Sequence, residues 1–157
     1  MIESVKMSLQ ISERYRVLVL CTGNSARSQM AEGLINARLA DRFVAQSAGT
    51  HPADDVHPQA IAALREIGID ISDHRPKPVD EFRGVPFDVV ITVCDHAAET
   101  CPVWLGQGQR VHIGFPDPAA APLDQQTRKF RAVRDAIEDR LLDYLRHWQP
   151  EAKRRKA

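Results

Sequence analysis

The sequence predicts a single α/β domain built on a parallel β-sheet covered by helices. Short runs rich in valine, leucine and isoleucine alternate along the chain with segments of helical periodicity, which is the pattern of a parallel sheet with crossover helices. The first run is apolar at successive rather than alternate positions, as in a strand buried on both faces. A length of 157 residues is enough for one hydrophobic core and too short for two.

The first half of the chain contains two predicted strands and two predicted helices. A strand over residues 16–20 leads through a polar loop into an amphipathic helix over 28–40. A short strand over 43–46 follows. The next helix begins at Pro58, which suits a first helical turn, and ends near Gly68, which suits a left-handed C-terminal cap.

The second half adds strands over 87–93 and 110–113 and one long closing helix. Because ligands of such sheets bind at the carboxyl ends of the strands, we expect the functional site there. Large apolar residues recur in the closing helix at spacings of three and four, and we interpret them as core rather than as a binding surface: Phe130, Val133, Ile137, Leu141, Tyr144 and Trp148.

We divide the chain into a loosely ordered extension over residues 1–14, one domain over 15–148 and a basic tail over 149–157. Acidic and basic residues balance at 21 each, so no overall field favours nucleic acid or an anionic membrane. The apolar run over 17–21 is far too short to span a bilayer or to form a signal-peptide core. We therefore expect a cytoplasmic protein, and we expect it to be a monomer.

The loop after the first strand has the residues of an anion site. Its backbone N–H groups and the positive end of the following helix both favour a bound anion. Gly23 and Asn24 tolerate the left-handed backbone of a tight cradle, and the planar guanidinium of Arg27 matches a tetrahedral oxyanion. The expected oxyanion-binding residues are Thr22, Gly23, Asn24, Ser25, Ala26, Arg27 and Ser28.

Cys21 begins this loop. The chain has three cysteines, an odd number, and no export signal. This indicates free thiols with a chemical role rather than a framework of structural disulfides. The helix terminus and the nearby guanidinium lower the pKa of such a thiol from ~8.5 to within ~3.5–7.5, which gives a nucleophilic thiolate. We expect the hydroxyls of Ser25 and Ser28 to face the sulfur or the anion. The alternative is an inert buried cysteine.

The stretch "CTGNSARSQMAEG" resembles the phosphate-binding loop of the low-molecular-weight protein tyrosine phosphatase superfamily, and it is especially similar to that of the thioredoxin-coupled arsenate reductases built on this fold. The likeness continues through "SAGT", "TVCDHAAETCP" and "HIGFPDPA" and covers roughly residues 15–148. It implies a three-layer fold of flavodoxin-like topology, with a four-stranded parallel sheet flanked by helices.

A candidate general acid lies in "GFPDPA". Asp117 stands between Pro116 and Pro118, which leave its backbone little freedom. A carboxyl group close to a bound anion holds its proton more readily, as an acid for an oxygen leaving group must. An aspartate beside proline is also a common turn former. The resemblance favours the catalytic interpretation, because the general acid of the family is the aspartate of this Asp-Pro pair.

Cys94 and Cys101 distinguish a reductase from a phosphatase. Cys94 follows the third predicted strand, at the sheet edge that also carries Cys21. A helix over 94–101 would separate the two thiols by ~10 Å, whereas a disulfide needs Cα atoms within ~7 Å. We therefore infer a segment that unwinds on oxidation. Two unrelated thiols, or two zinc ligands with His96, are the alternatives, although a structural zinc site requires four ligands.

The resemblance implies the following reaction. Cys21 attacks arsenic while Asp117 protonates the departing oxygen, and Cys94 then attacks the sulfur of Cys21 so that arsenite leaves. Cys101 next attacks Cys94. Thioredoxin reduces the disulfide that results, and the enzyme holds no bound cofactor and no metal.

The sequence departs from the family at three places. Many relatives have another cysteine where this chain has Ala26, and the tyrosine phosphatases have an aromatic residue where it has Ala119. Some relatives bind potassium through residues that correspond to Asn24, Glu32 and Ser47. Because this chain has Arg75 and Lys77 nearby rather than an added acid, we predict no potassium there.

Two other functions remain open at this point. A tyrosine or small-ester phosphatase would share Cys21, Arg27 and Asp117 and would hydrolyse a phosphocysteine, but it would not need Cys94 or Cys101. An oxyanion-binding or redox-sensing domain would show no turnover, and a disulfide between Cys94 and Cys101 would control its partner.

Overall fold

The computed structural model describes residues 14–95, 97 and 108–150 of the chain. The predicted extension over 1–14, apart from Arg14, therefore lies outside the described residues, as does most of the predicted basic tail. Cys101 and His96 lie outside them as well.

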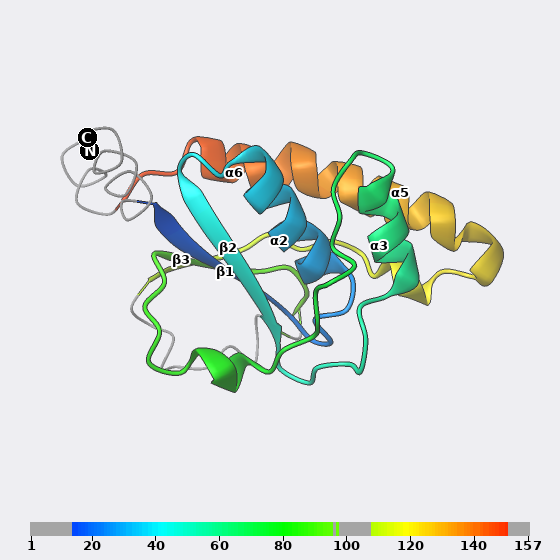
Figure 1. The fold of residues 1–157 in the computed structure, drawn as a ribbon, viewed down its shortest axis with the longest axis horizontal. Coiled ribbons are helices and arrows are strands. Elements are labelled where there is room, and N and C mark those ends of the chain that lie inside the picture. Colours follow the sequence, from blue (N-terminus) through cyan, green and yellow to red (C-terminus); the bar gives the residue numbers. More distant parts are fainter. Residues whose placement is uncertain (1–13, 96, 98–107, 151–157) are drawn as a thin grey trace.

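A four-stranded parallel sheet forms the centre of the molecule (Figure 1). Its strand order, β2-β1-β3-β4, confirms the predicted parallel sheet and flavodoxin-like topology. Because β1 is central, its carboxyl end meets those of β2 and β3. The strands are β1 (Tyr15–Cys21), β2 (Phe43–Gly49), β3 (Val89–Thr92) and β4 (Gln109–His112).

Both inner strands are buried along their length. Residues 17–20 of β1 and 89–91 of β3 have no exposed surface, as predicted from their unbroken apolar sequence. β2 is longer than the strand predicted over 43–46, because its pairing with β1 continues to the Cys21–Gly49 pair. The small residues at its end, Ser47, Ala48 and Gly49, gave no strand signal, yet backbone pairing does not depend on side chains.

Helix α2 packs on β1 and β2, and the other helices pack around α2 and against one another (Figure 1). Helix α2 contacts β1, β2 and α3. The helical elements are α2 (Arg27–Arg38), α3 (Pro58–Arg65), α5 (Gln126–Ala136), the π-helical segment η5 (Ile137–Leu142) and α6 (Asp143–Arg146). The described residues also form 3₁₀ turns at η1 (Val79–Phe82), η3 (Pro118–Ala120) and η4 (Leu123–Gln125).

The predicted ends of α3 are confirmed. Pro58 is its first residue, and His57 caps it by accepting the N–H of Gln59 at 3.1 Å. Gly68 has a φ of +82°, the left-handed conformation expected after the helix.

The closing helix keeps its predicted core face but contains a π-helical segment that its periodicity did not predict. A π turn takes up an additional residue, and Leu141 and Leu142 are both fully buried there. Trp148 packs edge-on against Tyr15, the first residue of β1, with the ring centroids 4.9 Å apart. Among the described residues, no helix is long and apolar enough to cross a membrane.

Candidate active site

The loop between β1 and α2 is held by the segment that follows β2. Four N–H groups of that segment bind carbonyl oxygens of the loop. A peptide N–H points opposite to its own C=O, so loop carbonyls engaged on one side turn N–H groups toward the other side, as in an anion-binding nest. The four bonds run from Thr50 to Cys21 (3.2 Å), His51 to Thr22 (2.8 Å), Ala53 to Gly23 (2.8 Å) and His57 to Ser25 (2.9 Å).

Asn24 fixes the curvature of the loop. It has a φ of 51°, so the predicted left-handed residue is Asn24 and not Gly23. Its buried amide donates to Ser28 Oγ at 2.8 Å and to Ser47 Oγ at 2.9 Å. Its Oδ1 accepts the backbone N–H of Lys77 at 2.9 Å. These bonds satisfy a buried polar side chain and hold the left-handed backbone in place.

Gly49, the last residue of β2, allows the loop to come close to the strand. A Cβ atom at this position would lie 2.6 Å from the carbonyl oxygen of Thr22 and 3.1 Å from the backbone nitrogen of Asn24. Only glycine fits between the strand and the loop without displacing backbone atoms.

Arg27 is the first residue of α2, and its guanidinium reaches the segment that carries Asp117. Its NH1 donates to the carbonyl oxygen of Phe115 at 3.0 Å. Arg140 supports that segment, since it donates to the carbonyl of Gly114 at 3.1 Å and lies over the Phe115 ring at 4.9 Å. The bond to Phe115 uses one of the five N–H groups of a guanidinium.

Cys21 and Cys94 are buried, reduced and hydrogen-bonded to each other. The Thr22 hydroxyl lies 3.2 Å from the sulfur of Cys94, and the N–H of Ala97 donates to that sulfur at 3.4 Å. The sheet explains this proximity, because β1 and β3 are neighbours and their carboxyl ends bring together residues far apart in the sequence.

The pKa values of the two thiols depend on each other. The hydrogen bond from Cys21 lowers the pKa of Cys94 to about 4, with the Thr22 hydroxyl, the Ala97 N–H and the charge of Arg27 acting in the same direction and burial opposing them. The same bond, together with burial, raises the pKa of Cys21, while the Asn24 N–H and Arg27 oppose the rise. The sequence analysis expected a lowered pKa at Cys21; the buried second thiol beside it is the reason for the difference.

The contacts that the loop hydroxyls make are with other protein groups, and the predicted contact with an anion stays a prediction. The Ser25 hydroxyl donates to the carbonyl of Asp55 at 3.1 Å, and Ser28 Oγ accepts the amide of Asn24. The Thr22 hydroxyl contacts Cys94. These side chains shape the loop, and backbone N–H groups and Arg27 remain the groups that we expect to hold an anion.

Asp117 is exposed at the start of η3, where its Oδ1 accepts the N–H of Ala119 at 3.0 Å. The turn-forming aspect of this residue is thus confirmed, and its role as an acid remains a prediction. Asp117 also affects His57. Burial lowers the pKa of His57, and the charge of Asp117 raises it.

His57 is a site residue that the sequence did not predict. This residue bonds the loop through its N–H, caps α3 and stacks on Phe130 at 4.6 Å between ring centroids. The only sequence signal was its position directly before Pro58, where a helix cap belongs.

Glu32 lies buried behind the loop and faces two basic groups. Ser47 Oγ donates to Glu32 Oε1 at 2.9 Å, His74 Nδ1 lies 3.1 Å from Oε2, and Lys77 Nζ lies 3.8 Å from Oε1. Across the described residues, no group of three or more histidine, cysteine or acidic side chains could hold a metal ion.

A strand, an anion-binding loop with a cysteine at its start, and an arginine at the first turn of a helix define a cysteine-dependent phosphatase-type site. Residues 16–155 match the model of the low molecular weight phosphotyrosine protein phosphatase family, and the chain belongs to this family.

Within the family, the chain is similar to arsenate reductases. It is 44% identical over 127 residues to one from Halalkalibacterium halodurans, covering 80% of this chain and 91% of the relative. It is 40% identical over 130 residues to one from Bacillus subtilis, covering 82% and 93%.

Two solved structures show the same fold. An arsenate reductase in the phosphate-binding state superimposes with a TM-score of 0.68 at 34% identity, over 82% of this chain and 95% of that one. A low molecular weight protein tyrosine phosphatase from T. tengcongensis gives a TM-score of 0.60 at 28% identity, over 80% and 98%.

Proposed function

We propose that this protein is an arsenate reductase that transfers electrons from its own thiols to a bound oxyanion. The observation that carries the proposal is the hydrogen-bonded pair of thiols, Cys21 in the anion loop and Cys94 beside it. A phosphatase requires only the first of them. The similarity to curated arsenate reductases supports the same conclusion.

In the first step, the loop N–H groups and Arg27 bind arsenate. Cys21 passes its proton to Cys94 across their hydrogen bond and attacks arsenic. A hydroxyl group of arsenate leaves as water after Asp117 protonates it. A sulfur–arsenic bond forms and an arsenic–oxygen bond breaks.

In the second step, Cys94 releases its proton and attacks the sulfur of Cys21. A disulfide forms, and the electron pair of the sulfur–arsenic bond stays on arsenic. Arsenic is reduced from As(V) to As(III) and leaves as arsenite. Phosphorus(V) does not accept this electron pair, so a phosphocysteine ends in hydrolysis instead.

We propose that Cys101 then attacks Cys94 and frees Cys21, and that thioredoxin reduces the resulting disulfide. This part of the scheme rests on the resemblance to thioredoxin-coupled arsenate reductases, since Cys101 lies outside the described residues. A reducing cytoplasm would keep all three thiols ready, and we propose that the protein acts there as a monomer.

Coupled turnover tests the proposal. Arsenate, thioredoxin, thioredoxin reductase and NADPH should together give steady arsenite production by the wild type. Cys94→Ser and Cys101→Ser should each abolish turnover while retaining slow hydrolysis of an aryl phosphate at Cys21. Aryl phosphate hydrolysis without any arsenite would instead identify a phosphatase, the second candidate function.

A further inference from the structure

A chain of hydrogen bonds connects the sheet to the residue that follows Cys94. Thr92 Oγ1 lies 2.8 Å from His112 Nδ1, and His112 Nε2 lies 3.0 Å from Asp95 Oδ1. Thr92 ends β3 and His112 ends β4, and the two are paired in the register of the sheet. Both ring nitrogens are engaged, so the histidine is fixed between a buried hydroxyl and an exposed carboxylate.

The backbone at Gly114 lies close to this chain of bonds. A Cβ atom at Gly114 would lie 3.0 Å from His112 Nε2 and 3.8 Å from Asp95 Oδ1. The carbonyl of Gly114 is itself held by Arg140 at 3.1 Å. The segment that carries Asp117 therefore passes directly against the contact between His112 and Asp95.

Asp95 belongs to the short turn that encloses the second thiol. It follows Cys94 directly, and two residues later the N–H of Ala97 closes the turn onto the Cys94 sulfur. The carboxylate of Asp95 is almost fully exposed, so packing does not hold it. The bond to His112 connects this turn to the last residue of β4, in addition to the burial of Ala97 in the core.

We propose that Thr92, His112 and Asp95 position Cys94: they anchor its turn to the end of the sheet and so hold its sulfur against Cys21. This inference rests on the proposed function, in which Cys94 attacks the Cys21 adduct. None of the three residues touches the oxyanion or the reacting atoms, so each is a positioning residue. Bond formation at Cys21 uses Cys94 only as a proton acceptor, so it should depend on them less than the attack by Cys94 does.

Two variants each break one bond of this chain with little risk to the fold: the His112–Asp95 bond in one and the Thr92–His112 bond in the other. Asp95→Ala truncates an exposed side chain, and Thr92→Val keeps the shape of a buried one. In a single turnover with arsenate, each should slow arsenite release about three- to fivefold, the effect of losing a partly exposed ion pair or hydrogen bond. Hydrolysis of an aryl phosphate, which needs Cys94 only to take up the proton of Cys21, should slow less than arsenite release does.

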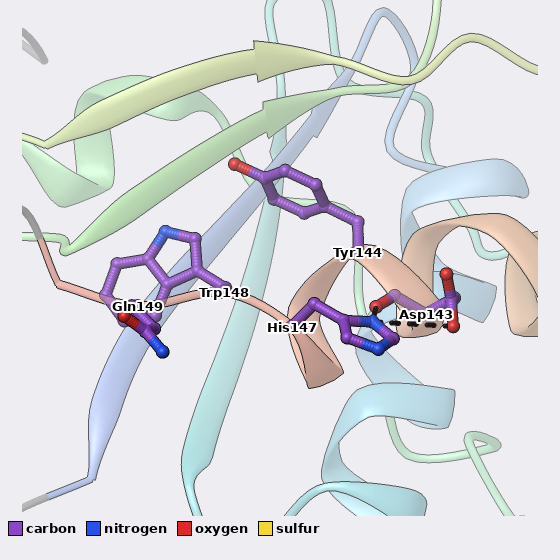
Figure 2. Close-up of a pocket in the computed structure, with 5 residues that line it drawn as sticks. All are labelled: Asp143, Tyr144, His147, Trp148 and Gln149. Carbon is purple, nitrogen blue, oxygen red and sulfur yellow. Dashed lines mark hydrogen bonds and ion pairs between the residues drawn. The ribbon is translucent and has the colours of Figure 1, made fainter. Parts of the chain in front are cut away.

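Further variants separate positioning from a general effect on structure. Asp95→Asn retains an oxygen that accepts from His112 and should recover most of the rate. The double variant should be no slower than either single one, because both break the same chain of bonds. Asp143→Ala is the control. It removes another exposed contact between an aspartate and a histidine, in which Asp143 Oδ1 lies 3.6 Å from His147 Nδ1, at the other end of the sheet (Figure 2). It should change neither activity.

Diamide-driven formation of the Cys21–Cys94 disulfide, followed in a Cys101→Ser background, gives a readout that does not depend on arsenic. It should slow by a similar factor in Asp95→Ala. Wild-type rates of disulfide formation in both Asp95→Ala and Thr92→Val would overturn the positioning role. A wild-type protein that forms no arsenite would overturn the proposed function, and the diamide rates would still decide the positioning role.

Discussion

At the scale of single residues, the site depends on how two sulfur atoms share a proton. Cys94 has its pKa lowered to about 4 chiefly by the hydrogen bond from Cys21. In the reaction proposed above, the pair loses one proton readily, and Cys21 becomes the nucleophile when its remaining proton crosses to Cys94. Neither thiol needs a distant base.

The sharing of the proton can be tested by removing the donor. In a Cys101→Ser background, Cys21→Ala should raise the pKa of Cys94 toward the ordinary value of a thiol, ~8.5, because the largest cause of its lowering is lost. The rate of alkylation by iodoacetamide as a function of pH measures this pKa. An unchanged profile would show that Thr22 and Ala97 suffice to hold the thiolate.

His57 gives a pH dependence of stability. Burial lowers its pKa below 6.5 in the folded protein, so the unfolded chain takes up a proton first as pH falls. Stability should be fully present above about pH 7 and decline as pH drops through 6.5 toward the folded pKa. His57→Asn keeps a helix-capping side chain and should lose this contribution to acid sensitivity. Thermal unfolding of both proteins between about pH 8 and about pH 5 measures the difference.

At the scale of secondary-structure elements, the contact between β2 and the anion loop decides whether the cradle forms. Gly49→Ala would press a Cβ atom to 2.6 Å from the Thr22 carbonyl, and overpacking of this kind costs about 1–3 kcal/mol. We expect a lower melting temperature and loss of binding of inorganic phosphate, measured by calorimetry.

Gly23→Ala is the matched control for that substitution. It lies in the loop itself, but the nearest atoms to its added Cβ are 3.9 Å away, which is ordinary contact. It should bind phosphate as the wild type does. Equal losses in the two variants would mean that the loop does not depend on its approach to β2.

The buried carboxylate of Glu32 gives a prediction about monovalent cations. Lys77 and His74 already face it, so a potassium ion has no uncompensated charge to bind there. Arsenate turnover should be the same in potassium and in sodium salts at equal ionic strength. Strong stimulation by potassium would contradict this prediction.

At the scale of the whole molecule, the sequence predicted the sheet, its parallel strands and the anion loop, because these depend on local patterns. It placed Cys94 at the same sheet edge as Cys21 but did not predict their contact, which follows from β1 and β3 being neighbours. The prediction that the pKa of Cys21 is lowered was wrong for that reason, because the neighbouring thiol of Cys94 raises it. The chain of bonds from Thr92 to Asp95 and the role of His57 were missed, because both join residues distant in sequence.

The most direct test of the account is a single turnover of Cys101→Ser with arsenate and no external reductant, followed by mass spectrometry. If Cys21 and Cys94 act in succession, each chain should release about one arsenite and finish with a Cys21–Cys94 disulfide, since two thiols supply the two electrons. Arsenite formation with both thiols still free, or no arsenite at all, would contradict it.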